Sequence, residues 1–146
     1  MRTHRMALML LPAALACSNG GTSPTEAQPD FATACSPAKP KIAAEPTAVT
    51  RLPGATGTTK FTVRNNCATT LTGWSLTSSR TGAVTSVGAP SRARLPSLVP
   101  NQSVNVYVSY RLGSSGTGSV VLLARSASGL NSFGYQGVTV GTSAGF

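Results

Sequence analysis

Beyond Lys41 the chain consists of short stretches in which apolar and polar residues alternate, a pattern typical of β-strands with one buried face. The clearest stretch runs from Val104 to Arg111, where three valines and Tyr110 share one face, and Tyr107 and polar residues share the other. Similar stretches occupy residues 48–52, 60–64, 73–77, 83–87, 118–124 and 135–140. The pattern predicts about seven strands.

Turn-forming residues separate these stretches, as they do in all-β domains. Pro-Gly at 53–54, Gly-Ala-Pro at 88–90 and Pro-Asn at 100–101 each fall between two alternating runs. Beyond residue 16, no window has the apolar stripe of an amphipathic helix of useful length. About 100 residues of this kind suffice for one sandwich core and are too few for two domains. Residues 41–146 are therefore predicted to form a single all-β sandwich.

Trp74 is the only tryptophan of the chain, thirteen positions after Phe61. A third-strand tryptophan packs against the core in immunoglobulin-like sandwiches. We expect Trp74 to be a buried core residue. The alternative is an exposed platform for a ligand.

The first sixteen residues have the features of an export signal. Arg2 and Arg5 precede an apolar run that is too short to span a bilayer, and small residues lead into Cys17. We expect residues 1–16 to be removed. The ending Ala-Leu-Ala-Cys also resembles the lipobox of bacterial lipoproteins, with Leu and the first Ala in reversed order. We expect a lipid on Cys17 and a chain anchored to the bacterial cell envelope, with plain secretion as the alternative.

Three cysteines in an exported chain leave one unpaired unless one has another role. If Cys17 carries a lipid, Cys35 and Cys67 are free to form a disulfide in an oxidising compartment. Such a bridge would stabilise the fold by about 3 to 4 kcal/mol. Two cysteines without a histidine cannot complete a four-ligand zinc site, so no metal or other cofactor is expected.

Residues 17–40 are rich in Ser, Thr, Gly, Pro and Ala, and Phe31 is the only large apolar residue before Ile42. This composition predicts a flexible tether. A tether would hold the folded module away from a membrane surface. The alternative is that residues 17–40 are disordered and do not act as a spacer.

Four segments resemble parts of bacterial surface immunoglobulin-like domains, which are exported β-sandwiches. They are residues 61–66 (FTVRNN), 98–110 (LVPNQSVNVYVSY), 116–122 (GTGSVVL) and 134–140 (GYQGVTV). Asn101 replaces the usual turn glycine, which Asn tolerates because it also adopts positive φ. The strand from Val104 has no cysteine for a bridge through the core, so Cys67 is expected at a strand end, tying down the N-terminal arm. The resemblance implies a spacer, adhesion or ligand-binding module, and no catalytic residues.

The residue inventory of the predicted domain excludes most catalytic chemistry. His4 lies in the leader, and the three acidic residues, Glu26, Asp30 and Glu45, all precede Pro46. Without imidazole or carboxylate side chains, the remaining chain lacks the groups of a Ser-His-Asp triad, a carboxylate pair or a histidine metal site. We therefore expect that the protein is not an enzyme.

The predicted domain is strongly basic. The formal net charge of the chain is +9, and no acidic side chain follows residue 45. The cations beyond that point are Arg51, Lys60, Arg64, Arg80, Arg92, Arg94, Arg111 and Arg125. A field of this sign attracts polyanions, although the cations are scattered and no nucleic-acid motif accompanies them. Arg92 and Arg94 are the one local pair with same-side spacing on a strand and hence the candidate contact for an anionic polymer; a solubilising surface is the alternative.

These observations predict a non-catalytic cell-surface or secreted module with a structural, adhesion or ligand-binding role. Its expected partners are a membrane, through the lipid on Cys17, and an anionic polymer or a surface protein, with no specific nucleic acid. Tyr107 is a candidate exposed contact. Two alternatives stay open: a subunit that self-assembles into an extracellular fibre or layer, and a basic binder of polysaccharide or DNA. The sequence leaves the oligomeric state open.

Overall fold

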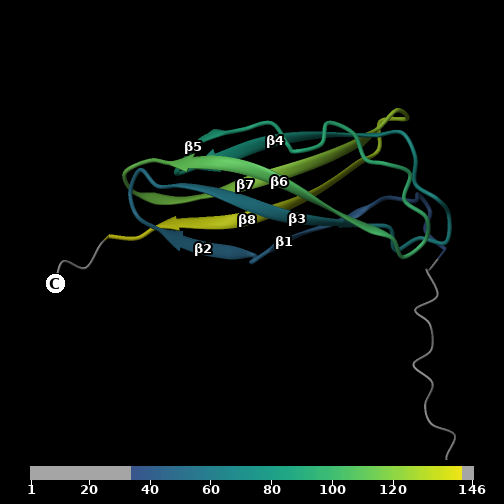
Figure 1. Cartoon of the computed structure of the whole chain (residues 1–146), viewed down its shortest axis with the longest axis horizontal. Coiled ribbons are helices and arrows are strands. Elements are labelled where there is room, and N and C mark those ends of the chain that lie inside the picture. Colours follow the sequence, from purple (N-terminus) through teal and green to yellow (C-terminus); the bar gives the residue numbers. More distant parts are fainter. Residues whose placement is uncertain (1–33, 143–146) are drawn as a thin grey trace, which may run out of the picture.

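The computed structural model describes residues 34–142, which form two four-stranded sheets packed face to face (Figure 1). The strands are β1 (Lys41–Glu45), β2 (Ala48–Arg51), β3 (Thr56–Arg64), β4 (Trp74–Gly82), β5 (Val84–Val87), β6 (Ser103–Leu112), β7 (Gly116–Ser126) and β8 (Asn131–Val140). The first sheet has the order β1-β3-β6-β5, and the second has the order β2-β8-β7-β4. The predicted all-β sandwich is confirmed, with β1 as a strand that the alternation did not reveal.

The strand order is that of an immunoglobulin-like sandwich. With β1 and β2 as the two halves of the first strand, the sheets read A-B-E-D and A′-G-F-C in the lettering of that fold. The chain changes sheets at Pro46, because β1 pairs antiparallel with β3 whereas β2 pairs parallel with β8. The described chain enters at one end of the sandwich and leaves at the opposite end (Figure 1).

The core lies between the inner faces of the two sheets. Trp74, the first residue of β4, is 4% exposed, which confirms the expectation of a buried tryptophan. The alternation in β6 is confirmed as well, because Val106, Val108 and Tyr110 are buried while Tyr107 is exposed. Burial of such apolar side chains on folding is the main stabilising contribution to a sandwich of this size.

A disulfide closes the end of the sandwich at which the described chain begins. Cys35 and Cys67 are bonded, with their Cα atoms 5.3 Å apart. Cys67 follows β3 and Cys35 precedes β1, so the bridge ties the N-terminal arm to a strand end, as predicted. The buried Asn65 orders the adjoining loop: its Nδ2 donates to the carbonyls of Thr69 and Leu98, and its Oδ1 accepts from the N–H of Cys67.

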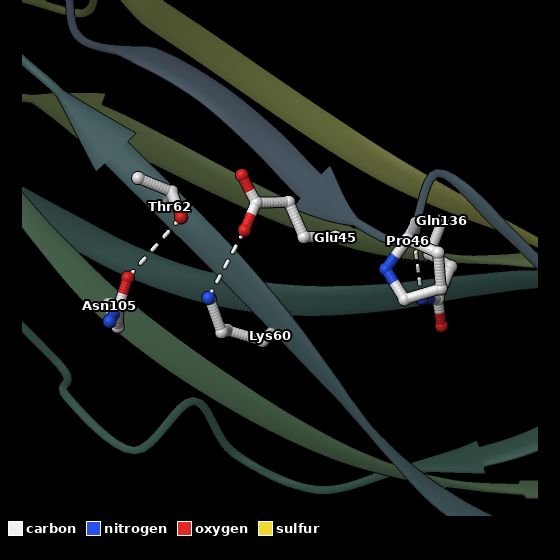
Figure 2. Close-up of polar contacts among 6 residues, drawn as sticks. All are labelled: Glu45, Pro46, Lys60, Thr62, Asn105 and Gln136. Atoms are coloured by element: carbon white, nitrogen blue, oxygen red, sulfur yellow. Dashed lines mark hydrogen bonds and ion pairs between the residues drawn. The ribbon is translucent and has the colours of Figure 1, made fainter.

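A buried polar network links the sheets where the chain passes from β1 to β2. Gln136 of β8 is 2% exposed. Its Oε1 accepts a hydrogen bond from the Thr59 hydroxyl of β3 at 2.8 Å. Its Nε2 donates to the Pro46 carbonyl at 2.7 Å (Figure 2). No buried side-chain polar atom within residues 34–142 lacks a partner. The amide is therefore satisfied inside the core and does not carry the cost of an unpaired polar group.

The predicted leader at 1–16, the predicted lipid site Cys17 and most of the 17–40 tether lie outside the described residues. Within residues 34–142, no helix is long and apolar enough to cross a membrane.

Candidate ligand-binding face

Strand β8 turns its aromatic side chains toward solvent. Phe133 and Tyr135 are each 65% exposed. Gly134 and Gln136, which alternate with them, are buried on the inner face. Large apolar side chains are the ones that folding normally buries. The strand therefore faces opposite to the direction that its hydrophobicity alone favours.

Close packing and hydrogen bonding account for this orientation. A Cβ built on Gly134 would lie 2.6 Å from Ile42 Cγ2 and 2.8 Å from the Ile42 carbonyl oxygen, so β8 approaches β1 too closely for a side chain. Gln136 is held inside by its bonds to Thr59 and Pro46. A register shift of one residue would exchange the two faces of the strand. It would bring large rings into a space that admits only a glycine.

Strand β7 extends the apolar surface beside these rings. Leu123 pairs with Phe133, and Val121 pairs with Tyr135. Residues that are directly opposite in antiparallel strands present their side chains on the same face. Both β7 residues are half-buried. We call Val121, Leu123, Phe133 and Tyr135 the aromatic face.

At one end of the aromatic face lies a hollow of about 230 Å³, lined in part by Trp74, Ser75, Arg94 and Arg125. We call it the basic hollow. Ser75 of β4 pairs with Arg94 on one side and with Arg125 of β7 on the other. The three residues thus form one row across the sheet. The Ser75 hydroxyl donates to the Arg125 carbonyl at 3.1 Å, which joins β4 to β7 within this row.

Within the described residues, no side chain neutralises the two arginines of the basic hollow. Among residues 34–142, neither the Arg94 nor the Arg125 guanidinium has a hydrogen bond or an ion pair with another residue. Glu45, the one carboxylate side chain in this part of the sequence, lies in the first sheet and pairs with Lys60 at 3.1 Å (Figure 2). The hollow therefore keeps a positive field that an external anion could neutralise.

The outer face of the first sheet has a different character. Tyr107 is 46% exposed there, in agreement with its predicted outward position. Its register partner is Lys60. On the same face the Thr62 hydroxyl donates to Asn105 Oδ1 at 3.2 Å (Figure 2). Polar pairs satisfy one another on this face, whereas the second sheet exposes adjacent rings.

Of the two arginines predicted to contact an anionic polymer, one lies at the basic hollow and the other does not. Arg92 and Arg94 are both exposed in the segment between β5 and β6, but only Arg94 lines the basic hollow. The arginine that joins it there is Arg125, and the register of β4 with β7 brings the two together. Within the described part of the chain, no group of three or more His, Cys, Asp or Glu side chains could hold a metal ion.

The aromatic face is not evident from the sequence. Alternation located the strand at 135–140 without deciding which of its faces is buried. The available signal was the pair Gly134 and Gln136, which alternate with the two rings along the strand. A glycine and an amide on one face of a strand are weak indicators of core. Only the packing of Gly134 against Ile42 and the hydrogen bonds of Gln136 to Thr59 and Pro46 identify this face as the buried one.

No protein-family model matches the sequence, and no curated protein matches it. Solved structures align with the chain at low identity. The secreted serine protease VesC from Vibrio cholerae aligns at 16% identity with a TM-score of 0.46, over 64% of this chain and 21% of the protease chain. The ASH or PapD-like domain 7 of human CEP192 aligns at 12% identity with a TM-score of 0.43, over 97% of this chain and 99% of that domain. The fold assignment rests on the strand order and not on these likenesses.

Proposed function

We propose that this protein is a non-catalytic binding module of the cell envelope that takes its ligand on the outer face of the second sheet. The observation that carries the proposal is the outward orientation of Phe133 and Tyr135. Adjacent exposed apolar side chains with a polar rim mark interaction sites on soluble domains. A strand that exposes its rings and buries a glycine and an amide departs from local sequence preference, as functional sites do.

The aromatic face has the properties of a binding surface. Phe and Tyr rings have few rotatable bonds, so little side-chain entropy is lost when a ligand covers them. Leu123 and Val121 lie beside the rings and extend the apolar area. The neighbouring strand β4 borders this area with the exposed hydroxyls of Thr77 and Ser79. A ligand with a flat apolar surface and polar edges fits such an arrangement.

Attachment to the envelope is the second part of the proposal. The leader at 1–16, the lipid site at Cys17 and the Ser/Thr/Pro-rich composition of 17–40 support it. The Cys35–Cys67 disulfide fits an oxidising compartment outside the cytoplasm. The described chain begins at one end of the sandwich, so attachment from that end leaves the outer face of each sheet open to a ligand (Figure 1).

Co-sedimentation tests the binding face. The exported chain with Cys17→Ser, which lacks the proposed lipid site, is mixed with washed cells of the producing strain and with their insoluble extracellular polymer. We expect it to sediment with one or both. Phe133→Ser/Tyr135→Ser should weaken retention about tenfold or more, because central aromatic contacts supply most of the binding free energy.

Tyr107→Ser is the matched control, because it removes an exposed ring from the other sheet. It should leave retention unchanged. Circular dichroism and thermal unfolding should be the same for all variants, since the substituted side chains are exposed. Equal retention of the three chains, or an equal loss for Tyr107→Ser, would contradict the proposed face.

A further inference from the structure

The basic hollow and the aromatic face form one continuous surface. Arg125 and Leu123 are two residues apart on β7, and their register partners on β8 are Asn131 and Phe133. Side chains two residues apart on a strand share a face and lie about 7 Å apart. A ligand that stacks on Phe133 therefore reaches the guanidinium of Arg125. It must carry an apolar surface and a negative group at about that spacing.

The charges lie at one end of this surface. Arg94 and Arg125 flank Ser75, and neither guanidinium has a protein partner among the described residues. A guanidinium binds a carboxylate through two parallel hydrogen bonds, so this end fits a carboxylate group. Farther along the same face, the cross-strand rows of the second sheet contain Phe133 and Tyr135. These rows present aromatic rings, aliphatic side chains and hydroxyls, and they contain no cation. The ligand is thus acidic in one unit and uncharged in the next.

We infer that the ligand is an acidic polysaccharide in which sugars bearing a carboxylate alternate with neutral sugars. This inference rests on the proposed function. Neutral rings would lie with their C–H faces on Phe133 and Tyr135, and the carboxylate would bind Arg94 and Arg125. The exposed hydroxyls of β4 would exchange hydrogen bonds with those of the sugars.

Three other ligands fit the surface less well. An extended peptide typically adds to a sheet edge, whereas the rings lie on a sheet face. A single-stranded nucleic acid has a phosphate at every unit, whereas the cations here lie at one end only. A second copy stacked on the same face would bring its own Arg94 and Arg125 against this surface, where the described chain has no carboxylate to pair with them.

The test measures dissociation constants at about 0.15 M salt, where exposed charges more than about 8 Å apart are screened. The Cys17→Ser full chain is titrated with hyaluronate and with gellan, two linear polymers that contain carboxylate-bearing and neutral sugars. The carboxyl-reduced form of each polymer keeps the same rings without the charge. We expect binding to the acidic forms and about tenfold weaker binding to the reduced forms.

Matched variants distinguish binding at the basic hollow from non-specific attraction to the positive surface. Arg94→Gln/Arg125→Gln should weaken binding of the acidic polymers about tenfold and bind acidic and reduced forms equally. Arg51→Gln/Arg111→Gln removes the same charge elsewhere and should change binding by less than about threefold. Phe133→Ser/Tyr135→Ser should weaken binding of both forms, because the rings contact the sugars and not the carboxylate.

Several results would overturn the inference. Equal losses for the two arginine pairs would mean non-specific attraction. Tighter binding of polyglutamate, single-stranded DNA or phosphatidylglycerol vesicles, with loss in Arg94→Gln/Arg125→Gln, would assign the site to that class instead. If neither polysaccharide binds, or if the acidic and reduced forms bind equally, while retention on cells still requires Phe133 and Tyr135, the acidic glycan is wrong and the proposed function stands. If Phe133→Ser/Tyr135→Ser changes neither measurement, both proposals fail.

Discussion

At the scale of single residues, Gly134 lies where β8 approaches β1 too closely for a side chain, since a Cβ there would meet both the side chain and the backbone of Ile42. Its neighbour Gln136 holds the same face inward through hydrogen bonds to Thr59 and Pro46. Neither residue contacts the proposed ligand, because both are buried on the inner face. Both act by fixing the face on which the rings are presented.

Gly134→Ala is expected to destabilise the fold by about 1 to 3 kcal/mol, because the added methyl overpacks against the backbone of β1. Gly137→Ala is the control on the same strand. A Cβ at Gly137 would have Ala48 Cβ as its nearest neighbour, at 3.7 Å, which is ordinary contact. Its unfolding free energy should change by about 0.5 kcal/mol or less. Urea unfolding measures both, and equal effects would refute the packing argument.

At the scale of elements, the alternation of apolar residues predicted seven of the strands. Buried side chains occupy every second position over much of β3, β6 and β7 and at the start of β4, whereas β2 has only the half-buried Val49. The alternation did not predict β1, in which Ile42 is the one large apolar residue and Ala44 is the other buried one. Asn101 adopts φ of 66°, which confirms the expected positive-φ turn before β6. Turn chemistry is local and therefore readable from sequence.

The candidate site was less predictable than the fold. Arg94 and Arg125 meet only because the segment before β6 pairs with the start of β4, which in turn pairs with β7. The two-residue spacing of Arg92 and Arg94 shows only that both would lie on one face of an extended segment. It does not indicate which residues of neighbouring strands lie beside them. Pairings between distant segments decide which side chains gather on a sheet face, and the amino-acid pattern of one strand does not specify them.

The disulfide acts at the same scale, since it joins the arm before β1 to the end of β3. Reduction of the exported chain is expected to lower its unfolding free energy by about 3 to 4 kcal/mol. Urea unfolding with and without dithiothreitol measures the loss. The Cys35→Ala/Cys67→Ala chain should be destabilised already and should show no further response to the reductant. An unchanged midpoint on reduction of the wild-type chain would contradict this expectation.

At the scale of the whole molecule, one sheet has a polar outer face with an ion pair between Glu45 and Lys60. The other has the aromatic face beside Arg94 and Arg125, whose guanidinium groups have no partner among residues 34–142. The protein therefore has two chemically distinct sides. An excess of positive charge disfavours close association between copies and favours binding of anions. A module held from one end, as proposed, can present the aromatic side to the cell exterior.

Anchoring belongs to this scale and depends on Cys17. Labelled fatty acid should enter the wild-type chain, because the Ala-Leu-Ala-Cys ending of the leader resembles a lipobox. Cys17→Ser should take up no label and should appear in the soluble fraction. Equal labelling and equal fractionation of the two chains would exclude the lipid anchor.

The most direct test of the binding face is its footprint on the protein. The ¹⁵N-labelled Cys17→Ser chain is titrated with soluble fragments of the polymer with which it sediments. Amide NMR spectra are recorded at each addition. We expect shift changes concentrated on β7 and β8 around Leu123, Phe133 and Tyr135 and extending to Arg125, with the amides near Tyr107 unchanged. Changes centred on the outer face of β3 and β6, or spread evenly over the basic surface, would contradict it.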